Sequence, residues 1–138
     1  LTTAMENMRA KGLNFYSEEV EEWLDCGNKD ATVYTNQRIL EIKKNIETLV
    51  PDNSLFQNTI IIPPCYIAPD VTISNSIIGP HVSLEKGCKV NNSIITNSII
   101  RESTFIDNGN ITNSLIGKAT VIKEIPKEHS LGDYSTLQ

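Results

Sequence analysis

Aliphatic residues recur every five or six positions through the second half of the chain, from Ile62 to Ile122. The lengths of these intervals repeat with a period of three, since every third interval has nearly the same length. Intervals of six begin at Ile67, Leu84, Ile100 and Ile116, those of five at Ile73, Val90 and Ile106, and the third set, five with one six, at Ile62, Ile78, Ile95 and Ile111. Three short strands per turn form a triangular solenoid in which each side keeps its own length. The pattern therefore predicts a mainly β fold, with a coiled parallel β-solenoid over residues 62–122.

A second position in each interval is predicted to point inward together with the leading residue. The fourth residue after the leader is mostly small or β-branched, at Val71, Ile77, Val82, Cys88, Ile94, Ile99, Thr104, Leu115 and Thr120. β-Branched side chains suit the wall of a sheet, and stacked neighbours supply the core that no single turn has alone. On this register an Ile94→Asp substitution should unfold the solenoid.

Asparagines recur in the motif Asn-Ser-Ile-Ile or Asn-Ser-Leu-Ile, at Asn75, Asn92, Asn97 and Asn113. In the triangular register Asn75, Asn92 and Asn108 form one column, and Asn97 and Asn113 form another. Side-chain amides one turn apart, about 4.8 Å, can hydrogen-bond to each other. The asparagines are therefore predicted to fasten the walls rather than to bind a ligand.

The first half of the chain predicts a small α/β segment that ends in an amphipathic helix. Residues 3–12 predict a short helix, 13–23 contain a predicted strand, and 25–28 form a predicted turn. Asn28 or Asp30 is the expected N-cap of the second helix, whose apolar stripe is Ile39, Ile42, Ile46 and Leu49. This segment has too few apolar residues for a core of its own, so it should pack on the solenoid or on another domain.

The pattern divides the chain into four parts: residues 1–50, a linker at 51–61, the solenoid at 62–122 and a tail at 123–138. The chain begins at Leu1 and runs at once into helix-like sequence. We therefore expect a fragment or a processed product of a longer protein.

Composition excludes several classes of partner. A formal net charge of −5 and a pI near 5.0 argue against nucleic acids and anionic membranes, which attract clustered Lys and Arg. No apolar run is long enough to span a bilayer. The three cysteines, Cys26, Cys65 and Cys88, are an odd number without CxxC spacing. Reduced thiols in the cytoplasm fit them better than disulfides or zinc.

Three solenoid intervals resemble the repeat of bacterial hexapeptide transferases. They are Ile67-Ala-Pro-Asp-Val-Thr, Ile78-Gly-Pro-His-Val-Ser and Leu84-Glu-Lys-Gly-Cys-Lys. The resemblance implies a left-handed parallel β-helix, an exception to the right-handed rule for parallel crossovers. It implies no single function, because acyltransferases, nucleotidyltransferases and non-catalytic modules share the repeat.

The segment Glu22-Trp23-Leu24-Asp25-Cys26-Gly27-Asn28 resembles the end of the catalytic domain of sugar-1-phosphate nucleotidyltransferases, with glucose-1-phosphate thymidylyltransferases the nearest group. The match continues through Asp30-Ala31 and Asn36-Gln37-Arg38. In longer members of that family a left-handed β-helix follows the catalytic domain, in the order found here. The resemblance implies that residues 1–50 are the C-terminal remnant of such a domain, and that Asp25 helps to bind Mg²⁺.

The same resemblance implies an activity for the longer protein: an NTP and a sugar-1-phosphate give a nucleotide-sugar and diphosphate. The family's Gly-rich nucleotide loop, its sugar-phosphate lysine and its first metal-binding aspartate have no counterpart in these 138 residues. Phosphoryl transfer depends on positioning and charge neutralisation, so the chain alone is expected to be inactive and to hold no cofactor. Its expected role is assembly or regulation, with a homo-oligomer formed through the β-helix.

Two other functions remain open at this level. An acyltransferase that uses acyl-CoA would need a histidine as general base, and His81 is the candidate; His129 lies in the polar tail. A purely structural oligomerisation module would self-associate without binding a small molecule. Cys26 is not expected to be a nucleophile, because no histidine lies near it in sequence to activate its thiol. Cys88 is expected to be an inert residue of the core.

Overall fold

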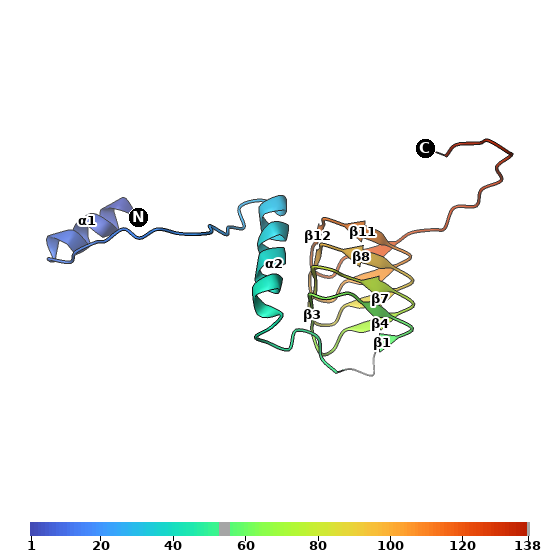
Figure 1. Cartoon of the computed structure of the whole chain (residues 1–138), viewed down its shortest axis with the longest axis horizontal. Helices are drawn as coiled ribbons and strands as arrows, with labels where there is room; N and C mark the ends of the chain where they lie inside the picture. Colours follow the sequence, from blue (N-terminus) through green and yellow to red (C-terminus); the bar gives the residue numbers. More distant parts are fainter. Residues whose placement is uncertain (53–55, 138) are drawn as a thin grey trace.

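The computed structural model describes residues 1–52 and 56–137 (Figure 1). Two helices, α1 (Thr2–Ala10) and α2 (Lys29–Lys43), precede a run of short strands. The strands are β1 (Phe56–Gln57), β2 (Ile60–Ile61), β3 (Cys65–Ile67), β4 (Thr72–Ser74), β5 (Ile77–Ile78), β6 (Val82–Leu84), β7 (Lys89–Asn91), β8 (Ile94–Thr96), β9 (Ile99–Ile100), β10 (Phe105–Asp107), β11 (Asn110–Thr112), β12 (Leu115–Ile116) and β13 (Val121–Lys123).

The strands coil into a parallel β-solenoid of about four turns, as the sequence predicts. Every third strand pairs, which gives three walls. Wall A consists of β1, β4, β7, β10 and β13, wall B of β2, β5, β8 and β11, and wall C of β3, β6, β9 and β12. The predicted leading residues fill the interior. Those that are fully enclosed are Ile67, Ile73, Ile78, Leu84, Val90, Ile95, Ile100 and Ile106.

The first turn begins earlier than predicted. Strands β1 and β2 already pair with β4 and β5, so residues 56–61 of the predicted linker belong to the solenoid; residues 53–55 of that linker lie outside the described residues. Ile61, not Ile62, pairs with Ile78 in the inward column, and Ile62 is exposed. Three consecutive isoleucines stand here, Ile60, Ile61 and Ile62, and strand pairing gives the inward place to the middle one, six positions before Ile67, just as Ile78 stands six before Leu84.

The second inward position was predicted correctly only in the longer intervals. Val71, Val82, Cys88 and Thr104 are buried as expected. Ile94, by contrast, is 46% exposed and points outward, while Ile95 beside it is fully buried. In the shorter intervals the second inward residue is the serine three positions after the leader: Ser76, Ser93 and Ser98.

These serines link one turn of the solenoid to the next. Each hydroxyl donates to the carbonyl two residues earlier, at 2.5 Å from Ser93 Oγ to Asn91 O and 2.7 Å from Ser98 Oγ to Thr96 O. Each also accepts a backbone N–H from the following turn, as from Gly109 to Ser93 Oγ at 3.0 Å. A buried hydroxyl is thereby satisfied on both sides, as the solenoid interior requires.

The asparagines stand at the corners in a left-handed backbone conformation. Asn75, Asn92, Asn97 and Asn113 have φ between 42° and 48°, a region that asparagine tolerates better than other non-glycine residues. The predicted amide pairing is found between Asn97 and Asn113, at 3.4 Å, whereas in the other column Asn75 accepts from Asn58 at 2.9 Å and Asn92 Nδ2 donates to Asp107 Oδ1 at 3.4 Å. Backbone geometry therefore explains the motif more fully than amide stacking does.

The first half of the chain differs from its prediction in one element. Helix α1 forms where expected, but the described residues 13–23 contain no strand. Helix α2 begins after Asn28, whose side-chain oxygen accepts the N–H of Ala31 at 2.9 Å, as an N-cap does. Figure 1 shows α2 lying along one side of the solenoid, with α1 standing apart from it.

Candidate functional site

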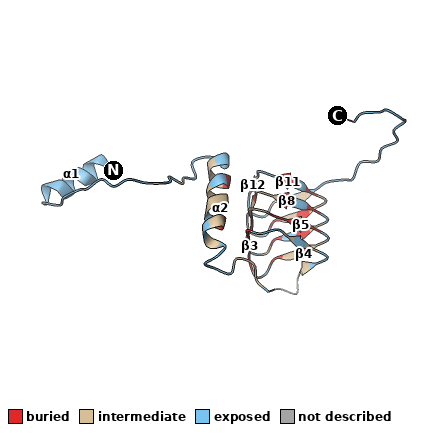
Figure 2. Cartoon of the chain, viewed as in Figure 1, coloured by how far each residue is buried: buried red, intermediate tan, exposed pale blue. Residues whose placement is uncertain are grey.

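Helix α2 packs against wall C. Figure 2 shows buried positions on the side of α2 that faces the solenoid. They are Val33 and Leu40, which lie two turns apart on one face of the helix. The outward column of wall C beneath it is Tyr66, Ser83, Ile99 and Leu115, which pair across the strands. Two apolar anchors and an apolar column thus hold the helix to the wall.

Polar contacts fix the position of α2 on this wall. Ser83 Oγ donates to Asn36 Oδ1 at 2.6 Å, and Lys29 Nζ donates to the carbonyl of Asn113 at 3.1 Å. After the helix, the N–H of Ile67 donates to Leu49 O at 2.9 Å. The sequence signal for this contact is Ser83 itself, a small polar residue in an outward column whose other members are Tyr66, Ile99 and Leu115.

The predicted apolar stripe of the second helix is not its docking face. Ile39 and Ile42 are exposed, and the helix ends at Lys43, so the predicted members Ile46 and Leu49 lie beyond it. Successive residues turn by about 100° in a helix, so Ile42 lies about 200° from Leu40, on the opposite side. Helix α2 therefore carries two apolar faces, one on wall C and one bare.

Asp25 lies in the loop directly before α2. Gly27 N donates to its carboxylate at 3.4 Å, and Thr35 Oγ1, on α2, donates to the Asp25 carbonyl at 2.5 Å. The N-cap Asn28 completes the turn. The loop is thus tied to α2 through its backbone, and the Asp25 carboxylate remains exposed to solvent.

Glu22 anchors the start of this loop to the side of α2. Its carboxylate accepts Arg38 Nε at 2.7 Å and Tyr34 Oη at 3.2 Å. The hydrogen bond from Arg38 holds the pKa of the Glu22 carboxyl below its ordinary value, and Glu22 in turn raises the pKa of Arg38. Trp23, the next residue, is exposed.

The residues around Asp25 offer one carboxylate to a metal. Among the described residues, no group of three His, Cys, Asp or Glu side chains could hold a metal ion together. Mg²⁺ usually takes one or two protein carboxylates and fills its other positions with water and substrate phosphate oxygens. Asp25 could supply one such carboxylate to Mg²⁺, and the other ligands would have to come from outside this chain.

His81 is covered by α2. Its Nε2 lies 2.7 Å from Glu41 Oε1, its backbone carbonyl accepts Asn36 Nδ2 at 3.4 Å, and its backbone is left-handed, with φ 62°. A general base must reach a substrate proton. The partners of His81 give it a role in docking the helix.

The cysteines lie as their positions in the pattern suggest. Cys65 and Cys88 are buried free thiols, and burial raises the pKa of both. Cys88 is therefore inert core, as predicted. Cys26 is exposed and free.

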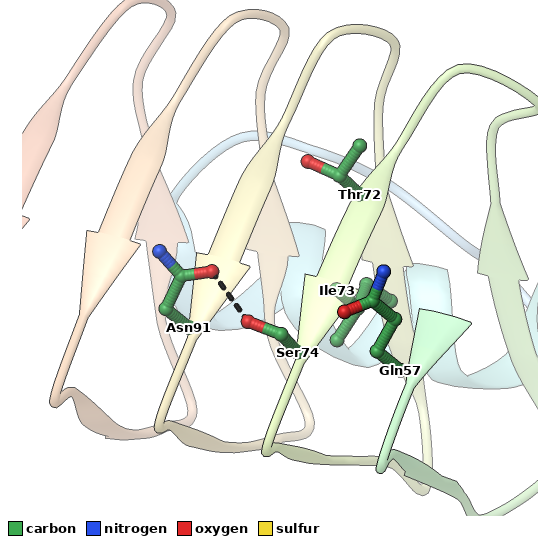
Figure 3. Close-up of a pocket in the computed structure, with 5 residues that line it drawn as sticks. All are labelled: Gln57, Thr72, Ile73, Ser74 and Asn91. Carbon is green, nitrogen blue, oxygen red and sulfur yellow. Dashed lines mark hydrogen bonds between the residues drawn. The ribbon is translucent and has the colours of Figure 1, made fainter. Parts of the chain in front are cut away.

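Wall A carries a shallow pocket of about 220 Å³ near the first turn (Figure 3). Its lining is Gln57, Thr72, Ile73, Ser74 and Asn91. Ser74 Oγ donates to Asn91 Oδ1 at 2.7 Å, the dashed line in Figure 3. Amides and hydroxyls can hydrogen-bond a polar group, but no side chain lining this pocket titrates near neutral pH. The pocket therefore has no acid–base chemistry.

The chain matches none of the known protein families, curated proteins and solved structures with which it was compared. None of the helices in the described part of the chain has the length and apolar character needed to cross a membrane. Function is therefore argued from the side chains themselves.

Proposed function

We propose that this chain is the C-terminal portion of a sugar-1-phosphate nucleotidyltransferase of the glucose-1-phosphate thymidylyltransferase type. The longer enzyme would convert an NTP and a sugar-1-phosphate into a nucleotide-sugar and diphosphate, with Mg²⁺. The left-handed sense of the β-helix, its role in assembly or regulation and a cytoplasmic location belong to the same proposal. Its first support is the order of parts: the Asp25 segment, a capped helix and a parallel solenoid.

The observation that carries the proposal is the double-faced helix α2. One face is docked on wall C, while Ile39 and Ile42 are open to solvent on the other. A helix that is apolar on two sides belongs between two packed bodies. The catalytic domain of a longer enzyme would supply the second body, covering the bare face of α2.

The segment that leads into α2 extends the same argument. Its large apolar side chains are exposed throughout, namely Leu13, Phe15, Tyr16, Val20 and Trp23. Five large apolar side chains exposed within eleven residues are more than the scattered singles of an ordinary surface, and they favour a partner for this segment. Because Glu22 ties the end of the segment to Arg38 on α2, the segment and the bare helix face would be covered together.

Asp25 has a definite task under this proposal. Bound Mg²⁺ neutralises charge on phosphate oxygens during nucleotidyl transfer. The Asp25 carboxylate would be one of its ligands, held in place by the Thr35 contact and the Asn28 cap. Since α2 is fixed to wall C, the solenoid would set the position of this loop.

The test is diphosphate release by the product of the whole gene, with dTTP and each of the four ribonucleoside triphosphates in turn, plus glucose-1-phosphate and Mg²⁺. We expect activity from the whole product and none from the 138-residue chain. Asp25→Asn should lower the rate about 100-fold or more, as loss of a metal contact does. The matched control is Asp30→Asn, an exposed aspartate in the first turn of α2. An inactive whole product, or a fully active Asp25→Asn variant, would overturn the proposal.

A further inference from the structure

The three walls of the solenoid have different outer surfaces. Wall C is covered by α2, and wall A carries the charged residues Lys89, Asp107 and Lys123. Wall B has an apolar row instead: Ile60, Ile77 and Ile94 pair with one another on three successive strands. Ile60 is 59% exposed, and Ile62 beside the row is exposed as well. A row of isoleucines on the outer surface of a regular sheet is typical of a protein–protein interaction surface.

We propose that wall B is the face through which two copies of this chain associate about a two-fold axis. The inference rests on the assembly role proposed above, and it gives that role a specific face and partner. Two observations select a second copy as the partner: the absence of charge on the wall and the periodicity of the row.

Charge is the first of these observations. Among the described residues, the outward positions of wall B are all neutral: Ile60, Ile62, Ile77, Ile94, Thr96, Asn110 and Thr112. Each copy carries a formal net charge of −5, so two copies repel each other at most orientations. A neutral face is where that repulsion is least. A charged partner would find no opposite charge here to pair with.

Periodicity is the second observation. The row repeats once per strand, and strands lie about 4.8 Å apart. The surface that matches this repeat is the same row on another copy. A two-fold contact is self-complementary, so an axis near Ile77, the middle residue, sets Ile60 of one copy against Ile94 of the other.

The dimensions of the wall set the strength of the contact. Four strands of two or three residues give a face of roughly 10 by 20 Å. This is well below the roughly 800 Å² per partner of a standard interface. The association should therefore be weak and visible only as concentration rises.

Sedimentation equilibrium of the 138-residue chain over a wide concentration range tests the inference. We expect the mass to rise from one copy toward two. Ile94→Lys should weaken association at least tenfold, whereas Val121→Lys, at an exposed site on wall A, should leave it unchanged. Circular dichroism confirms that both variants are folded. A chain that stays monomeric, a limiting mass of three copies, or equal effects of the two variants would contradict the two-fold contact on wall B.

A cross-link gives a second, independent result. In a Cys26→Ser background, which removes the exposed thiol, Ile77→Cys should give a covalent dimer with a short bis-maleimide reagent, because sheets packed face to face lie about 10 Å apart, too far for a direct disulfide. Val121→Cys should not. Equal cross-linking at both sites would overturn the axis. Neither experiment depends on diphosphate release, so this inference and the proposed function can fail separately.

Discussion

Walls B and C come from the same repeat and fill the same core, yet one is covered and the other is bare. Their inward columns are nearly interchangeable, with Ile78 and Ile95 on wall B and Leu84 and Ile100 on wall C. The outward columns differ. Wall C offers Ser83 among apolar neighbours and accepts α2, whereas wall B offers only a row of isoleucines. In a solenoid the inward residues specify the fold, and the outward residues decide what each wall contacts.

The largest expected effect separates the inside of wall B from its outside. Ile95→Ala should lower the free energy of unfolding by about 2–5 kcal/mol, because it leaves a cavity in the core. Ile95→Asp should abolish the cooperative thermal transition. The neighbouring Ile94→Asp should cost at most about 1 kcal/mol, since Ile94 faces solvent. Chemical denaturation of dilute protein measures all three, and equal losses at the two positions would mean that the register is wrong.

The next effect concerns what wall C holds. Leu40→Ala removes an anchor that is buried between α2 and the wall. It should lower the free energy of opening α2 by about 2–5 kcal/mol, with little change in the solenoid strands. Ile42→Ala, on the bare face, should change it by about 0.5 kcal/mol or less. Hydrogen exchange of the α2 amides measures the two changes. A larger effect of Ile42→Ala than of Leu40→Ala would mean that the predicted stripe is the docking face.

A smaller effect tests the corners that all walls share. Asn92 has φ 46°, which costs most L-residues roughly 1–2 kcal/mol relative to their preferred conformations. Asn92→Ala should therefore lower the unfolding free energy by about 1 kcal/mol, while Asn92→Gly should be close to neutral. Should glycine prove as costly as alanine, the side-chain amide rather than the backbone would be the source of the stability.

The smallest effect is a pH dependence of the contact between α2 and wall C. Hydrogen bonds from His81 and then Lys44 hold the pKa of Glu41 below its ordinary value. A lowered folded-state pKa stabilises docking above the unfolded value, near 4.3, and that contribution is lost as the pH falls through the folded value. Below about pH 4 the helix should open more readily in the wild type, relative to neutral pH, than in Glu41→Gln. Identical acid profiles for α2 amide exchange would rule out this contribution.

The sequence predicted the inward leaders because period and residue type agree there. It misplaced Ile94 because Asn-Ser-Ile-Ile contains two adjacent isoleucines, and only the left-handed backbone at Asn92 decides which one turns inward. It misplaced the first turn by one residue because Ile60, Ile61 and Ile62 are all aliphatic, and only strand pairing shows that Ile61 takes the inward place. In both errors adjacent isoleucines compete for one inward position, and the spacing of side chains alone does not decide between them.

The candidate site was only partly predictable for a different reason. The Asn28 cap is a local signal and was confirmed. The docking face of α2 was wrong because Ile39 and Ile42 outweigh Val33 and Leu40 as a local stripe, whereas the real choice depends on Asn36 meeting Ser83, 47 positions along the chain. The role of Asp25 stays a prediction, since its other metal ligands would come from outside this chain.

Amide hydrogen exchange on the dilute wild-type chain tests most directly the central claim, that wall C holds α2 while the preceding segment is free. We predict strong protection for α2 amides around Val33 and Leu40, approaching that of the wall C strands, and rapid exchange throughout residues 13–23. If the α2 amides exchanged as fast as residues 13–23, the helix would not be docked. The solenoid would then have no hold on the Asp25 loop.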